Sequence, residues 1–253
     1  MLQDLLTLNV FGFLLLFCRV GTAFVTLPGF SAAYVSADIR LIMALAVSFV
    51  LAPVVVPGLP GPPSTVPGLI VLVLGEVLVG GFFGAIGRII FGALHTAGTL
   101  IAYEASLANA FVNDPIAEQQ GSVLSGFLTT VGIVFVFVTD VHHLMLRAVA
   151  DSYTLFIPGE MPAVGDFSEA ISRYVADSFA LAAQIASPFL LAGTAHFLLL
   201  GILGRLMPAL PVFFVGLPIQ IATQITLLAF SLSTMMLVFT TRFGEGFRAF
   251  TIS

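Results

Sequence analysis

Long apolar segments recur along the chain, and short clusters of proline, glycine and polar residues separate them. Within each segment the apolar residues continue for about 18 or more positions with few charges, which is the pattern of a membrane-spanning helix. No segment shows the regular alternation of a half-buried strand. We therefore predict an all-helical chain with about six long hydrophobic helices, covering approximately residues 5–27, 39–56, 69–110, 122–156, 168–206 and 219–242.

Proline and glycine mark where these helices end. Pro28-Gly29 closes the first segment, and the stretch PGLPGPPSTVPG at 57–68 separates the second from the third, because a helix cannot continue through it. The third segment is longer than the roughly 20 residues that one membrane span needs, so we expect it to bend, tilt or protrude. The sequence VNDPIAEQQG at 112–121 interrupts it.

Composition supports a membrane protein. Of the 253 residues, 59% are hydrophobic and only 8% are charged, whereas soluble domains carry about 25% charged residues. So few charges cannot cover a globule of this size, and the apolar excess has to face lipid or other apolar protein. The net charge of −5 is spread thinly and contains no basic run, which argues against nucleic-acid binding. We predict a polytopic, membrane-type helical fold with a single domain over 1–253.

Polar side chains recur at helical spacing within these apolar segments. In the fourth predicted helix, Asp140, His143, Arg147 and Asp151 follow one another at steps of three, four and four, with Thr129 on the same line. At about 100° per residue the four occupy an arc of about 80°. This spacing lets Arg147 reach Asp151 one turn away. Because a charge facing hydrocarbon is costly, we expect this face to meet protein or water.

Other predicted helices repeat the arrangement. The last predicted helix carries two glutamines one turn apart. The third carries an acidic residue and several glycines on one face, and glycines at this spacing let a neighbouring helix approach closely. Three interpretations remain open for these faces: packing within the chain, contact with another subunit, or a substrate or ion pathway. The residues concerned, besides the four named above, are Glu76, Gly80, Gly84, Gly87, Gln220 and Gln224.

The sequence offers little support for catalysis. His142 and His143 are not part of an H-E-x-x-H motif, and the sequence contains no G-x-S-x-G, P-loop or G-x-G-x-x-G motif. We expect no catalytic residue, no bound metal and no cofactor. Two classes remain. A small secondary transporter would use intramembrane ionisable residues near the midplane, whereas a gate or scaffold subunit would act through assembly with partners.

Five stretches, in order across nearly the whole chain, resemble the FliR-type family of export-gate proteins and their injectisome counterparts. One position departs from the family pattern, since Ala209 stands where a glutamine is expected. The last stretch is more similar to the flagellar branch than to the injectisome branch. The stretches are FCRVGTAFVTLPGF (17–30), DIRLIMALAVSFVLAP (38–53), DPIAEQQGSVLSGFL (114–128), DVHHLMLRAVADSY (140–153) and GRLMPALPVFFVGLPIQI (204–221).

The resemblance implies a chain built as a FliP-like unit fused to a FliQ-like one. Such a chain assembles with FliP and FliQ subunits into a cone in the bacterial inner membrane, at the flagellar basal body. Unfolded exported proteins pass through the cone, and FlhB and FlhA lie nearby. The family's middle loop contributes to a plug that closes the channel, which here implies Phe111, Val112, Asn113, Asp114 and Pro115. A plain loop outside the membrane is the alternative for this segment.

Overall fold

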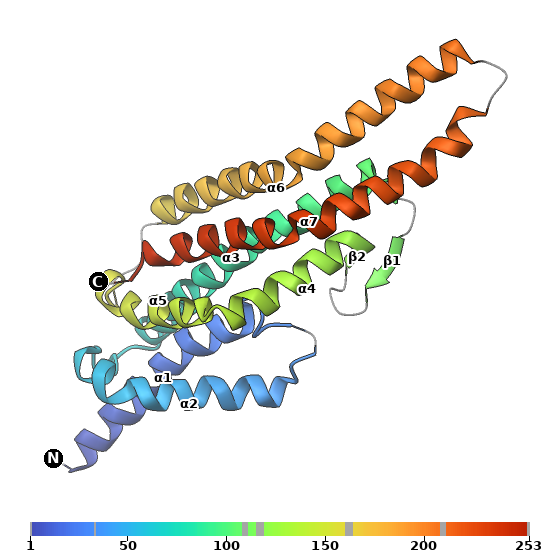
Figure 1. Ribbon diagram of the computed structural model, residues 1–253. Helices are drawn as coiled ribbons and strands as arrows, with labels where there is room; N and C mark the ends of the chain where they lie inside the picture. The colour runs from blue at the N-terminus through green and yellow to red at the C-terminus, as the bar shows by residue number, and fades with distance from the viewer. Residues whose placement is uncertain are drawn as a thin grey trace. The chain divides into compact units, whose positions relative to one another are not determined.

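A computed structural model describes residues 2–32, 34–107, 111–114, 119–159, 164–207 and 211–251. Seven α-helices, one short 3₁₀ helix and a two-stranded hairpin occur within these residues (Figure 1). The predicted helical fold is confirmed. In chain order the elements are α1 (Leu2–Thr26), α2 (Ala37–Val55), η1 (Val56–Gly58), α3 (Val66–Glu104), β1 (Phe111–Asp114), β2 (Gln119–Ser122), α4 (Val123–Val138), α5 (Val141–Leu155), α6 (Val164–Leu206) and α7 (Val212–Arg248).

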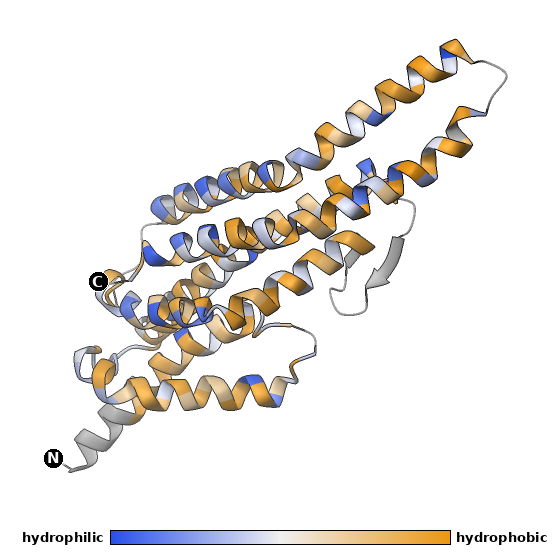
Figure 2. Ribbon diagram, in the orientation of Figure 1, coloured by the Kyte–Doolittle hydropathy of each residue, from blue (hydrophilic) through white to orange (hydrophobic). Residues whose placement is uncertain are grey.

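The described helices have the length and apolarity of membrane spans. Four of them could each cross a bilayer, and α4 with α5 adds a fifth if the two count as one broken span. Hydrophobic residues predominate along α2, α7 and the second half of α6 in Figure 2. Several are largely exposed on this chain: Val54 and Phe214 are each 81% exposed, and Phe230 is 84% exposed. This surface requires lipid or apolar partners. The chain is a polytopic helical membrane protein.

The chain divides into two compact units, each discontinuous in sequence, and α3, α6 and α7 contribute residues to both. Unit 1 comprises residues 1–89, 139–174 and 243–253. Unit 2 comprises residues 90–138 and 175–242.

Unit 1 is built around α1 and the first part of α3. Aromatic rings fill much of its interior. Phe82 stacks on Phe167 with the ring centroids 4.2 Å apart, and Phe83 meets Phe250 edge-on at 5.2 Å. Leu16, Phe24 and Ile86 are fully buried in the same unit. The helices therefore pack as a close hydrophobic core in this unit, which contrasts with the exposed apolar surface of α2.

Unit 2 packs the second part of α3 against α4 and the middle of α7. Phe91 and Phe239 meet edge-on, with centroids 5.1 Å apart. Two glycines bring the helices close together. A Cβ on Gly132 would lie 2.3 Å from Leu94, and one on Gly98 would lie 2.5 Å from the backbone of Ser125. A larger side chain at Gly98 would require the backbone of α4 to move, whereas one at Gly132 would displace the end of the Leu94 side chain.

The third helix ends earlier than predicted, at Glu104 instead of about residue 110. Ser106 adopts a left-handed conformation with φ of 57°. The N–H of Ser106 donates to the carbonyl of Tyr103, and the N–H of Leu107 donates to that of Ala102. This is the hydrogen-bond pattern of a Schellman motif, which terminates a helix. Glycine usually occupies the left-handed position, and a serine there gave no signal in the sequence.

The fourth predicted helix, 122–156, is two helices, α4 and α5. The chain leaves the helical conformation at Asp140, whose φ of 59° lies in the left-handed region. Neither proline nor glycine marks this break, and the apolar pattern continues across it. The sequence therefore predicts one helix where the structure has two. The last helix starts seven residues earlier than predicted, at Val212 instead of 219, and continues through Pro218. Proline there removes one backbone hydrogen bond but does not end the helix.

The helical fold contains one short hairpin, for which the sequence showed no strand pattern. β1 and β2 pair antiparallel, with Phe111 opposite Ser122 and Asp114 opposite Gln119. Each strand has four residues, so neither is long enough to show a clear alternation of apolar and polar side chains. The hairpin occupies part of the segment between α3 and α4.

Candidate functional site

Arg19 on α1 is the centre of a buried polar cluster in unit 1. Its side chain is almost completely buried. Its Nε donates to Glu76 Oε2 at 2.7 Å, and its Nη2 donates to Glu76 Oε1 at 3.0 Å. Nη1 donates to Ser152 Oγ at 2.9 Å, Nη2 also donates to the Phe156 carbonyl at 3.1 Å, and the guanidinium lies 3.9 Å from the centroid of the Tyr153 ring. We call these residues the Arg19 cluster.

The chemistry of the Arg19 cluster suits a structural contact that holds helices together. A guanidinium and a carboxylate bind each other through two parallel hydrogen bonds, which is the strongest geometry for this pair. The partners come from α1, α3 and the end of α5, so the cluster ties three helices together. The cavity beside it, which Arg19, Glu76 and Gly159 help to line, has a volume of about 10 Å³. That is about the space of one water molecule and excludes a transported solute.

The glycine face of α3 packs against α1 in the same unit. Each of three glycines lies where a side chain would collide with α1 or with Pro28, two residues after α1 ends. Arg88 continues the contact, because its Nε donates to the Thr26 carbonyl at 2.9 Å. A Cβ would lie 2.3 Å from the Arg19 carbonyl oxygen if added to Gly80, 1.9 Å from Thr26 Oγ1 if added to Gly84, and 2.6 Å from Pro28 Cδ if added to Gly87. The structure thus uses the predicted face of Glu76 and these glycines for packing within the chain.

The polar residues of α5 lie on its surface. Arg147 Nε is 3.7 Å from Asp151 Oδ2, at the predicted spacing of four residues, and His143 Nδ1 is 3.6 Å from Asp140 Oδ1. The predicted stripe is wrong in one respect. Asp140 lies at the break before α5 and not inside a continuous helix, so Thr129 of α4 does not share a helical face with the other residues.

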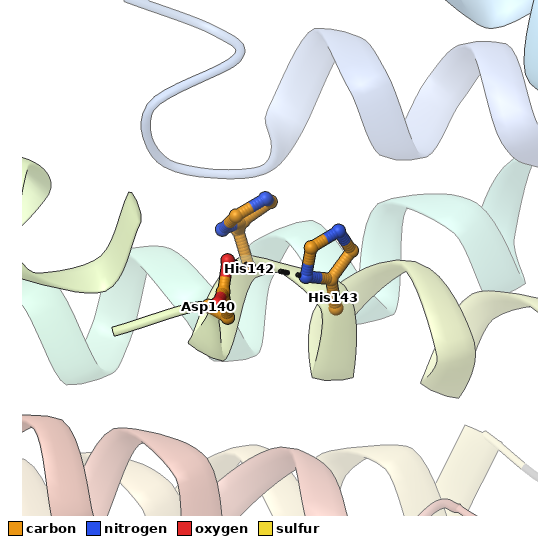
Figure 3. A group of neighbouring side chains, drawn as sticks. All are labelled: Asp140, His142 and His143. Atoms are coloured by element: carbon orange, nitrogen blue, oxygen red, sulfur yellow. Dashed lines mark ion pairs between the residues drawn. The ribbon is translucent and has the colours of Figure 1, made fainter. Parts of the chain in front are cut away.

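Asp140, His142 and His143 gather at the start of α5 and are the described residues most able to hold a metal ion (Figure 3). Two imidazoles and a carboxylate suit Zn²⁺. Their ligand atoms lie within 4.8 Å of one another, whereas the ligands of a tetrahedral zinc are about 3.3 Å apart. The group is also largely exposed, and its carboxylate already faces His143. We assign no metal to it.

The two glutamines of α7 are buried within unit 2. Gln220 Nε2 donates to the backbone carbonyl of Glu104 at the end of α3. Gln224 Nε2 donates to the Phe189 carbonyl of α6 at 3.2 Å. Each amide therefore binds a carbonyl on a different helix. The predicted polar face of the last helix is directed into the chain at these two positions.

The hairpin joins α3 to α4, and its second strand leads directly into the helix. Ser122 Oγ accepts a hydrogen bond from the N–H of Ser125 at 3.1 Å, so Ser122 caps α4. Asn113 and Asp114 lie in β1, opposite Gln120 and Gln119. Of the residues expected to form a plug, Phe111, Val112, Asn113 and Asp114 make up β1, and Pro115 lies outside the described residues.

Sequence reasoning missed Arg19 and Glu104. A signal for Arg19 exists, because Glu76 is the one acidic residue between Asp38 and Glu104. A lone basic residue in one apolar helix and a lone acidic residue in another are expected to pair. Glu104 gave no such signal, since its contacts are to residues of α6 and α7 that are distant in sequence.

The chain matches the family described as bacterial export proteins, family 1, over residues 10–246. It is 36% identical over 237 residues to the flagellar biosynthetic protein FliR of Caulobacter vibrioides, with 94% of each chain covered. It is 31% identical over 231 residues to the protein of the same name from Bacillus subtilis, covering 89% of this chain and 88% of the relative. The protein of that name from Aquifex aeolicus is 29% identical over 243 residues, covering 94% and 91%.

Proposed function

This chain belongs to the bacterial export proteins of family 1, and we propose that it is a structural subunit of the flagellar type III protein-export gate. In this proposal it forms, with FliP and FliQ subunits, the channel through which unfolded flagellar proteins cross the inner membrane at the basal body. The observation that carries the proposal is the similarity over 94% of the chain to a relative named for flagellar biosynthesis.

The distribution of polar groups supports a structural role. The Arg19 cluster and the two buried glutamines bind groups within the chain, so they fix helices to one another. The large apolar side chains on the surface of α2, α6 and α7 need a hydrophobic environment, which lipid or neighbouring subunits supply. A subunit that functions through assembly accounts for both features.

The hairpin is the proposed plug of the channel. Three local features define it: the Schellman motif that ends α3, the pairing of β1 with β2, and the Ser122 cap that starts α4. Backbone that is not helical is tolerated at membrane depth only where it is buried in protein or lines a cavity. A short hairpin between two apolar helices fits a position inside a channel.

Two alternatives carry less support. An injectisome export-gate subunit would share the fold, but the relatives from Caulobacter vibrioides, Bacillus subtilis and Aquifex aeolicus are named as flagellar. A small secondary transporter would need a solute site, and the relatives named above are flagellar biosynthetic proteins and not transporters by name. In the flagellar assembly FlhB and FlhA would lie nearby, and the chain would need no cofactor.

Affinity purification of the tagged chain tests the assignment. The chain is expressed from its own locus, solubilised in a mild detergent and purified with its bound proteins, which mass spectrometry then identifies. We expect FliP and FliQ to copurify in fixed ratios with this chain. Recovery of a stable, monodisperse single subunit that binds a small solute would instead favour the transporter.

A further inference from the structure

Three hydrogen-bond acceptors are buried in unit 2 without a donor from the described residues: Glu104 Oε2, Gln220 Oε1 and Gln224 Oε1. The two glutamines are 1% and 2% exposed, and Glu104 is half-buried. A buried acceptor that lacks a donor destabilises the fold, and a charged acceptor does so more than a neutral one. Three such acceptors in one unit need a positively polarised partner.

The three acceptors belong to one locality. Gln220 binds the backbone of Glu104, and Gln224 follows Gln220 by one turn of α7. Gln224 binds the Phe189 carbonyl on α6, and Gly193 follows Phe189 by one turn of that helix. The Glu104 carboxylate lies against α6 at Gly193, since a Cβ on Gly193 would lie 1.9 Å from Glu104 Oε2. The acceptors therefore lie within about two helical turns of one another.

The hydrogen bond that each Nε2 donates fixes the orientation of its side-chain amide. Both Nε2 groups point at backbone carbonyls, which only accept, so rotating either amide would bring two acceptors together. The Oε1 atoms must then face away from those carbonyls. His196, three residues after Gly193 on α6, directs its Nε2 to the Gly216 carbonyl, 3.1 Å away.

We propose that Glu104, Gln220 and Gln224 bind a small monovalent cation, with Na⁺ as the best fit. Carboxylate and amide oxygens are the ligands of hard cations, and none of these three residues offers the nitrogen or sulfur that zinc prefers. A single carboxylate neutralises a single positive charge, whereas a divalent ion would leave a net charge in a poorly hydrated place. The bound ion would fix the last turn of α3 to α6 and α7.

The cation would hold the helix end from which the hairpin departs. Glu104 is the last residue of α3, and β1 begins at Phe111. This consequence concerns the anchoring of the segment and does not depend on what the hairpin closes. A failure of the channel assignment would leave the cation site intact, and the reverse also holds.

Thermal stability in different salts tests the site. The protein, purified with the subunits that accompany it, is melted in NaCl and in N-methyl-D-glucamine chloride at equal ionic strength. At a hundredfold excess of Na⁺ over its Kd, we expect the midpoint to rise by roughly 5–10 °C. Identical midpoints in the two salts, across the full concentration range, would overturn the proposal.

Two variants separate cation binding from a general salt effect. Glu104→Gln replaces the carboxylate with an amide that itself donates, so the variant should be stable without Na⁺ and insensitive to it. Gly193→Ala displaces the Glu104 carboxylate but removes no ligand, and it should also lose the response. Glu169→Gln, an exposed control on α6, should respond like the unmodified chain.

Broadening of the sodium NMR line provides a measurement that does not depend on any variant folding. The unmodified protein should broaden the line, and added N-methyl-D-glucamine should not displace the ion. A linewidth equal to that of buffer with detergent would contradict the proposal. Broadening that persists unchanged in a stable Glu104→Gln variant would also contradict it.

Discussion

Glu76→Gln tests how much the buried ion pair contributes to the fold. The Arg19 and Glu76 side chains are 1% and 2% exposed. The substitution keeps the shape of the side chain, removes its charge and turns one acceptor into a donor that faces the guanidinium. Breaking a buried pair from one side costs about 3–5 kcal/mol, because the remaining charge stays buried. For a chain of this size that corresponds to a loss of roughly 6–20 °C in melting midpoint.

The chain offers a matched control on α6. Arg173 and Glu169 form the same type of ion pair, but their side chains are 75% and 65% exposed. Such a pair contributes between 0 and about 1 kcal/mol, so Glu169→Gln should lower the midpoint by no more than roughly 4 °C. The two variants carry the same chemical change in opposite environments.

Size-exclusion chromatography of heated, fluorescently tagged protein provides the assay, because the chain contains no tryptophan to report unfolding. The fraction that remains monodisperse is plotted against temperature for each variant. Equal midpoints for Glu76→Gln and Glu169→Gln would refute the reasoning. That result would mean that the Arg19 cluster is hydrated, or that it contributes no more than a surface pair.

Three further predictions concern packing, assembly and closure. Gly84→Ala should lower the free energy of unfolding by about 1–2 kcal/mol, because the added Cβ would overlap Thr26. Gly75→Ala, with nothing within 4 Å, should be neutral or stabilising, and the reverse order would contradict the packing. Arg147→Leu should melt normally, since its ion pair is exposed, but should reduce recovery of the assembled complex; normal recovery would count against a role in subunit contact. Deleting residues 111–120 should make cells leaky to small solutes while export partly persists, and unchanged conductance in the assembled mutant would argue against a plug.

The apolar pattern predicted the main architecture. The long helices and the break at 57–68 followed from apolar runs and from proline and glycine, because these residues act on the backbone next to them. The same local signals failed where the chain turns without them. α3 ends at a left-handed Ser106, and α4 is separated from α5 by a left-handed Asp140. Both residues tolerate helices as well as turns.

The sequence also did not indicate which distant residues contact each other. Residues 19 and 76 are 57 positions apart, and residues 104 and 220 are 116 apart. Helical periodicity gives the face on which a side chain lies, but not the helix that it meets. The glycine face of α3 was visible at residues 80, 84 and 87, whereas its partner, α1, was not. Likewise, the spacing of Gln220 and Gln224 gave no indication that Glu104 lies beside them.

Photocrosslinking from the hairpin tests the central claim most directly. A photoreactive amino acid replaces Phe111 in β1, and the same replacement at Phe230, exposed on α7, is the control. Cells then express an exported protein fused to a domain that cannot unfold, which arrests it in the gate. The account predicts that position 111 crosslinks to the arrested protein and that position 230 crosslinks to lipid or to neighbouring subunits. Crosslinking of the arrested protein at position 230 and not at position 111 would contradict it.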